Sequence, residues 1–183
     1  MRHLFLLLTL CCLLFTNIAS AQNFSKLIVN SPPGEAIGGG TSYEISNGFT
    51  FDGYMNPLGG VTVTIHNSDY STWWQLDFAA ANDEPLMNGT YANCVRYPQA
   101  LDNSHHQLQI SSSHAPSCQH LTGSFMVKQL AWGPPFMVSS FHVTADQLCA
   151  GDAGPLHIEL YLIRPLATPT TTSSWGKLKT MYR

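Results

Sequence analysis

The sequence predicts an all-β fold, an antiparallel β-sandwich of roughly 8–10 strands in one domain. Trp74, Leu76 and Phe78 alternate with Trp73, Gln75 and Asp77, which is the period-2 pattern of a half-buried strand. Similar segments recur at short intervals between clusters of Gly, Pro, Asn and Asp. No stretch after residue 21 shows the sustained 3.6-residue periodicity of an amphipathic helix.

Strand segments precede this one along the chain: Phe24 to Asn30, Thr41 to Ser46, Phe49 to Asp52, and Val61 to Ile65. The Pro- and Gly-rich stretch Ser31 to Gly40 is expected to be a loop. Asn47-Gly48 is the strongest short hairpin signal, so we expect the two segments that flank it to pair directly.

The stretch Trp73 to Pro98 is expected to form the centre of the sheet. Breakers between Ala79 and Gly89 separate the first strand from a second, Thr90 to Tyr97, which is rich in β-branched and aromatic residues. We expect these two strands to pair, with Asp77 and Arg96 forming a structural ion pair that fixes their register.

The second half of the chain continues in the same way. Asp102 to His120 is polar and irregular, and a short strand is expected only at Gln107 to Ile110. Leu121 to Trp132 and Phe136 to Ala145 form a predicted hairpin around Gly133-Pro134-Pro135, and Leu156 to Ile163 closes the sheet. The chain from residue 165 to 183 is rich in Thr, Ser and Pro, which indicates a flexible tail, so the predicted domain spans residues 22–164.

Residues 1–21 have the pattern of a secretory signal peptide. Arg2 precedes an apolar run from Leu4 to Phe15, and Ala19-Ser20-Ala21 supplies the small residues of a cleavage site. The run is shorter than the about 20 residues that a membrane-spanning helix needs. We therefore predict a secreted protein, extracellular or periplasmic, without membrane insertion after cleavage.

Composition narrows the function further. The formal net charge is −3 and no basic stripe is present, which excludes a nucleic-acid interface. The domain is large enough to bury a core without cofactors, and no cofactor is predicted.

Cleavage of the signal peptide leaves Cys94, Cys118 and Cys149. One disulfide and one free thiol are therefore expected in an oxidising compartment, and spacing alone cannot choose the pair. The sequence leaves the oligomeric state open.

Several motifs then suggest a family. They are IGGGTSYEI at Ile37 to Ile45, WWQLDFAA at Trp73 to Ala80, NGTYANCVRYP at Asn88 to Pro98, LTGSF after Cys118, and FHVTADQLCAG at Phe141 to Gly151. With these motifs the chain resembles a family of small secreted bacterial all-β domains that have no assigned reaction, over roughly Leu27 to Arg164.

The resemblance implies an extracellular domain with a Cys118–Cys149 disulfide and with Cys94 as the free thiol. The chain departs from the family at SSSHAPS, Ser111 to Ser117, where the family has a Gly- and Asp-rich loop that contains Arg, and at Cys94, where the family has a small residue. A function carried by that loop therefore does not transfer to this chain.

No catalytic or metal-binding set emerges from the residues. The histidines at 105, 106, 114, 120, 142 and 157 lack the short ligand spacings of a zinc site, so no metal site is predicted. Cys94 lies in a strand without a neighbour that would lower its pKa, so it is either a buried inert thiol or part of an intermolecular disulfide. No G-x-S-x-G elbow is present, and Asp77 is the only acid of the central strand.

Binding is therefore the leading hypothesis. Trp73 has the parity opposite to that of Trp74, so it is expected to lie outside the core. With Tyr97, Tyr70 or Trp132 it would offer a stacking platform for a sugar or a peptide. We expect a secreted, non-enzymatic binding module for a glycan or a surface protein. The alternatives are a secreted hydrolase that uses acids and histidines near Asp77 and the 102–120 loop, and a structural protein of the envelope.

Overall fold

The computed structural model describes residues 25–98, 103–115 and 117–164, and it confirms the all-β prediction. The ten strands are β1 (Lys26–Asn30), β2 (Ser42–Ile45), β3 (Phe49–Met55), β4 (Val61–Asn67), β5 (Trp73–Ala79), β6 (Gly89–Arg96), β7 (Gln107–Ser112), β8 (Leu121–Gly133), β9 (Met137–Cys149) and β10 (Leu156–Ile163). A 3-10 turn, η1 (Ala81–Asp83), is the only helical element in these ranges, and no helix there could cross a membrane. The predicted signal peptide and tail lie outside the described residues.

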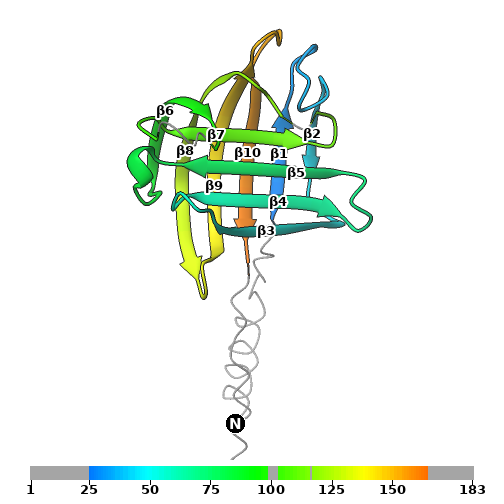
Figure 1. Cartoon of the computed structure of the whole chain (residues 1–183). Coiled ribbons are helices and arrows are strands. Elements are labelled where there is room, and N and C mark those ends of the chain that lie inside the picture. Colours follow the sequence, from blue (N-terminus) through cyan, green and yellow to red (C-terminus); the bar gives the residue numbers. More distant parts are fainter. Residues whose placement is uncertain (1–24, 99–102, 116, 165–183) are drawn as a thin grey trace, which may run out of the picture.

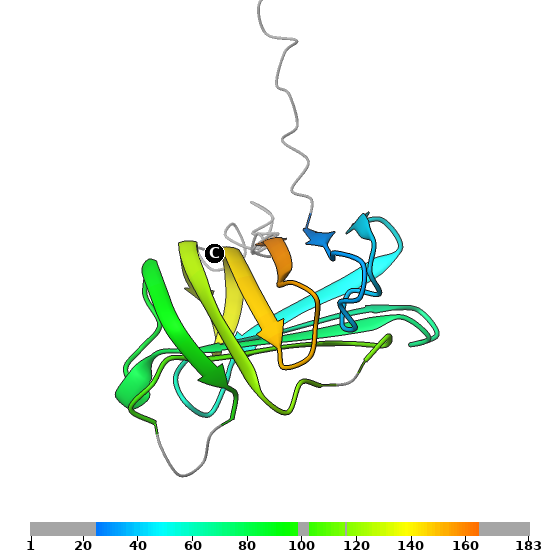
Figure 2. The ribbon, with the colours of Figure 1, turned by 90° about the horizontal axis from the view of Figure 1, so that it is seen from above.

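The strands stack in two layers, as a sandwich requires. The six-stranded sheet has the order β2-β1-β10-β9-β8-β6, and the four-stranded sheet has the order β3-β4-β5-β7. In Figure 1 the four-stranded sheet lies in front, and its strands run across those of the sheet behind it. Figure 2 shows the two layers from above. Every pair inside a layer is antiparallel.

The hydrophobic core lies between the two sheets. Trp74, Leu76 and Phe78 of β5 point into it and are at most 1% exposed. Phe78 meets Phe125 of β8 and Phe141 of β9 edge-on, with ring centroids 5.1 and 5.6 Å apart. Edge-to-face contacts at this separation are favourable, so β5 anchors one sheet to the other.

Two short contacts join the layers into one continuous ten-stranded sheet. β9 pairs with β3 at Met137 and Tyr54, and β6 runs parallel to β7 over two residue pairs. The predicted hairpin of residues 121–132 and 136–145 is confirmed as β8 and β9, and the predicted last strand is confirmed as β10.

The predicted pairing of the two central strands is wrong. Both strands exist, as β5 and β6, but β7 lies between them and pairs with each. The sequence of β7, QLQISS, is largely polar, whereas all six residues are buried. β7 extends past its contact with β6. There the N–H and the carbonyl of Ile110 hydrogen-bond to the side-chain amide of Gln147 on β9, whose Oε1 accepts at 2.7 Å and whose Nε2 donates at 3.0 Å.

The predicted hairpin at Asn47-Gly48 is also wrong, although the turn forms. Phe49 N–H donates to the Ser46 carbonyl at 3.4 Å, and Gly48 has φ +82°. β2 pairs with β1, however, and β3 pairs with β4. The turn therefore carries the chain from one sheet to the other, because a local turn signal reverses the chain without choosing the pairing partner.

Candidate functional site

The outer face of the four-stranded sheet, which points away from the core, carries polar and aromatic side chains. Pleating sends alternate residues to opposite faces. This face therefore holds Thr50, Asp52 and Tyr54 of β3, Thr62, Thr64 and His66 of β4, Trp73, Gln75 and Asp77 of β5, and Gln107, Gln109 and Ser111 of β7. The strand registers align Tyr54, Thr62, Asp77 and Gln109 in one row across the sheet.

Asp77 is the buried acid of this row, with 3% of its surface exposed. Thr62 Oγ1 donates to its Oδ1 at 2.5 Å, and Gln75 Nε2 donates to its Oδ2 at 2.9 Å. Burial raises the pKa of Asp77, and these two hydrogen bonds oppose that shift. A carboxylate offers about four acceptor positions, and Thr62 and Gln75 use two of them.

Two tyrosines flank this carboxylate. Burial, followed by the charge of Asp77, raises the pKa of both Tyr54 and Tyr97, and that of Tyr97 reaches about 12. The N–H of Tyr97 donates to the Leu108 carbonyl at 3.1 Å, which places it beside β7. Both phenols therefore stay protonated and can donate hydrogen bonds near Asp77 at neutral pH.

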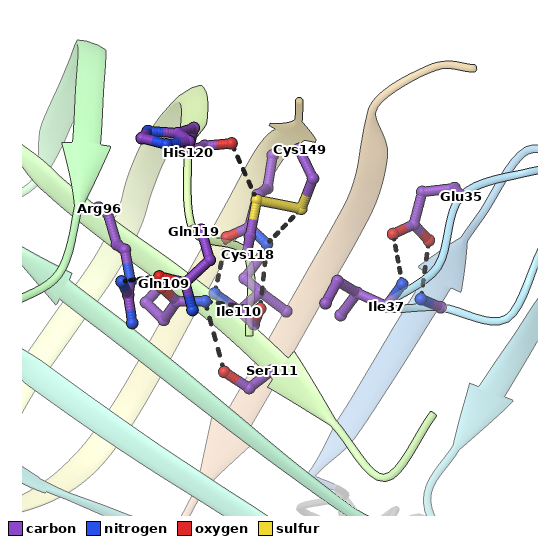
Figure 3. The surroundings of a disulfide bond; sticks show 12 residues. Glu35, Ile37, Arg96, Gln109, Ile110, Ser111, Cys118, Gln119, His120 and Cys149 are labelled. Carbon is purple, nitrogen blue, oxygen red and sulfur yellow. Dashed lines mark hydrogen bonds between the residues drawn. A yellow bond between two sulfur atoms is a disulfide. The ribbon is translucent and has the colours of Figure 1, made fainter. Parts of the chain in front are cut away.

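Arg96 does not pair with Asp77, so the predicted ion pair is wrong. Arg96 Nε donates to Gln109 Oε1 at 3.3 Å, and its Nη1 donates to Gln119 Oε1 at 3.0 Å (Figure 3). The insertion of β7 between β5 and β6 separates the two residues and gives Arg96 the amide of Gln109 as its partner.

A pocket of about 380 Å³, called here the arginine pocket, opens beside Arg96. Its lining residues are Val95, Arg96, Pro98, Gln119, His120 and Leu121. This volume lies within the usual range of small-ligand sites, and the lining combines apolar and polar side chains as such sites do.

The Cys118–Cys149 disulfide, which the resemblance implies, is confirmed, with Cα atoms 5.5 Å apart. It joins the segment before β8 to the end of β9, next to the arginine pocket (Figure 3). The N–H of Ala150 donates to the His120 carbonyl at 2.9 Å. The disulfide and this bond together fix the pocket wall formed by Gln119 and His120.

Cys94 is a free cysteine, as predicted, and it is buried with 2% of its surface exposed. Burial raises the pKa of its thiol to about 12. The thiolate is the reactive form of cysteine, so this residue is an inert core thiol rather than a nucleophile.

The three aromatic residues predicted to bind a ligand lie in different places. Trp73 is half-buried on the outer face of β5. Tyr97, which follows β6, is half-buried beside β7, where its N–H donates to the Leu108 carbonyl. Trp132 is 38% exposed on β8 of the six-stranded sheet, where it pairs with Val138 of β9. Trp73 and Trp132 thus belong to different sheets.

The histidines of the last strands pair with carboxylates. His142 Nε2 lies 2.8 Å from Glu159 Oε1, and His157 Nδ1 lies 2.8 Å from Asp146 Oδ1. Within the described ranges, no group of three or more His, Cys, Asp or Glu side chains is placed to hold a metal ion.

Sequence reasoning missed Tyr54, Gln75, Gln109 and Gln119 as site residues. The period-2 pattern gave a signal for Gln75, because it shares the parity of Trp73 and Asp77.

No family model, curated protein or solved structure matches the chain, so the resemblance to secreted bacterial domains stays a prediction.

Proposed function

We propose that the chain is an exported, non-enzymatic binding module whose ligand is a carbohydrate held on the outer face of the four-stranded sheet. The observation that carries this proposal is the row centred on Asp77. A buried carboxylate lies near two tyrosines and is bonded to the exposed amide of Gln75, and the half-buried ring of Trp73 lies on the same face four residues earlier in β5.

The chemistry of this surface matches that of a sugar ring. A pyranose presents hydroxyl groups at its edge and C–H groups on its faces. Carboxylate and amide side chains bind the hydroxyls in pairs of donors and acceptors, whereas aromatic rings cover the C–H faces. The disulfide supports the exported location, because such bonds persist in oxidising compartments.

The hydrogen bonds of Asp77 favour binding over hydrolysis. A glycosidase needs a second carboxyl group about 5–9 Å away across the scissile bond. Asp77 is bonded to Thr62 and Gln75, and neither can act as an acid or a base there. Asp52, the other acid on this face, is paired with Arg164. The other alternative is a structural protein of the envelope. Fractionation of cells and culture medium distinguishes it from a secreted protein.

A glycan array with the secreted chain, followed by calorimetry on the glycans it binds, tests the proposal. We expect Trp73→Ala to weaken binding by about tenfold, or about 1.4 kcal/mol, because the variant removes the aromatic surface that would cover a C–H face of the sugar. Trp132→Ala is the matched control on the other sheet and should leave affinity unchanged. Loss of binding in the control alone, binding to no glycan, or turnover of a bound glycan would each overturn the proposal.

A further inference from the structure

Arg96 differs from the other described Lys and Arg side chains because it has no carboxylate partner among the described residues. Lys26 pairs with Glu44, Lys128 with Glu159, and Arg164 with Asp52. In the same ranges Arg96 is bonded only to the neutral amide oxygens of Gln109 and Gln119. Its positive charge is therefore not compensated within this part of the chain.

The two amides leave part of the guanidinium group available. A guanidinium has five N–H donors. Gln109 and Gln119 use one on Nε and one on Nη1, so three, including both on Nη2, have no partner among the residues that the structure describes. The amides also fix the plane of the group, which lowers the entropy that a ligand must overcome to order the side chain.

The free donors lie in the wall of the arginine pocket. Arg96, Gln119 and His120 supply its polar lining, and Val95, Pro98 and Leu121 supply its apolar lining. Gln109 connects this pocket to the carbohydrate surface, because it is bonded to Arg96 and lies opposite Asp77 in the β5–β7 register.

We propose that the arginine pocket binds the carboxylate of an acidic sugar, so that the ligand class is a uronic-acid-containing saccharide; this inference rests on the proposed carbohydrate-binding function. A carboxylate accepts paired N–H bonds from a guanidinium in a plane, which a neutral sugar cannot do. The net charge of −3 does not prevent this, because charges are screened beyond about 8 Å at physiological salt.

The probes are an oligogalacturonate and its fully methyl-esterified form, which differ in the charge of the carboxyl groups. Calorimetry with the full secreted chain, at about 0.15 M salt, measures both. We expect the acid to bind about tenfold tighter than the ester. Arg96→Gln should reduce this preference to about twofold or less, whereas Lys26→Gln, which removes the same charge from the Glu44 pair of the six-stranded sheet, should keep it.

Equal affinity for acid and ester, or an unchanged preference in Arg96→Gln, would overturn the pocket assignment while the proposed function stands. A second measurement separates the two proposals if neither polymer binds. Free galacturonate is titrated while the NMR signals of the Arg96 Nε–H and the Gln119 amide are followed. Saturable shifts that Arg96→Gln abolishes would support the pocket even if the carbohydrate surface proposal fails, and their absence would overturn it.

Discussion

Thr62 donates its hydroxyl hydrogen bond to Asp77 across the β4–β5 pair, so a residue of one strand holds a buried carboxylate of the next. The cost of burying this charge remains, because burial raises the pKa of Asp77 in spite of the bond. A position that binds a ligand at the expense of stability is a common property of functional sites.

Asp77→Asn should therefore stabilise the protein and weaken its binding. The folded state holds the Asp77 proton more tightly than the unfolded state, so this residue's contribution to stability falls as pH rises from about 3.8 through its raised folded pKa. Asparagine removes that cost and still accepts from Thr62. At about pH 7 we expect a gain of up to about 1 kcal/mol in the free energy of unfolding by urea, together with weaker glycan binding.

The same urea titration below about pH 3.8 is the control, because Asp77 is then protonated in both states and the gain should disappear. A variant that is less stable than the parent at neutral pH, or a gain that does not depend on pH, would show that the buried charge is not the cause.

Cys94 should be unreactive in the folded protein. Its thiol is buried and its pKa is raised to about 12, so almost no accessible thiolate exists near pH 8. With the secreted chain that lacks residues 1–21, and so lacks Cys11 and Cys12, a thiol reagent such as DTNB should give no signal in the native state and one thiol per chain in guanidinium. Cys94→Ala should give none in either condition. Rapid labelling of the native parent would place this thiol at the surface.

The strands could be predicted from the sequence wherever one face of a strand is apolar. β5, β8, β9 and β10 follow the period-2 pattern, because each packs one face on the core. Which strands pair with one another could not be predicted in the same way. The sequence predicts a short strand at 107–110, but it does not predict that β7 lies between β5 and β6, because the side chains of β7 are largely polar although they are buried. The amide of Gln109, for example, is bonded to Arg96.

The candidate site was predicted in part for the same reason. Parity placed Trp73 and Asp77 on one face, and the structure agrees. The partnership of Arg96 with Gln109 and Gln119 depends on which strand lies next to β6, and on a segment held by the disulfide. Contacts of this kind join residues far apart in the chain, so no local pattern specifies them.

Glu159 should stabilise the fold in a pH-dependent manner. Hydrogen bonds from Lys128, then from His142, lower its pKa to about 2, and Tyr161 adds a third bond at 2.8 Å. A lowered folded pKa gives stability that is present above the unfolded value of about 4.5 and is lost as pH falls toward 2. Because Glu159 is partly exposed, the contribution is on the order of 1 kcal/mol.

Thermal unfolding of the parent and Glu159→Gln between about pH 2 and 6 measures this contribution. The two curves should separate as pH rises from 2 to 4.5 and stay parallel above it. Glu44→Gln is the matched control, because it removes the same charge from a more exposed pair with Lys26 and should have a smaller effect. Curves that remain parallel over the whole range would contradict the assignment.

Gly60 should tolerate no side chain, because it packs against the backbone of β5. A Cβ at this position would lie 1.9 Å from the Phe78 carbonyl oxygen and 2.9 Å from Ala79 Cα. Asn56 ties the same turn to β5, since its side-chain amide donates to the Phe78 carbonyl at 3.1 Å and its Oδ1 accepts from Gly60 N–H at 2.9 Å. Backbone cannot move aside as a flexible side chain can. Gly60→Ala should therefore cost roughly 2–4 kcal/mol in urea unfolding.

The matched control for this substitution is Gly48→Ala. Gly48 has φ +82°, and a methyl group on its Cα would meet no heavy atom within 4 Å, so alanine there encounters backbone strain alone and should cost about 1–2 kcal/mol. Because Phe78 follows Asp77 in β5, Gly60→Ala should also weaken glycan binding, which Gly48→Ala should leave unchanged. Equal losses of stability in the two variants would mean that the turn before β4 can shift to accommodate a methyl group at position 60. The close approach of Gly60 to β5 would then not be what positions Asp77.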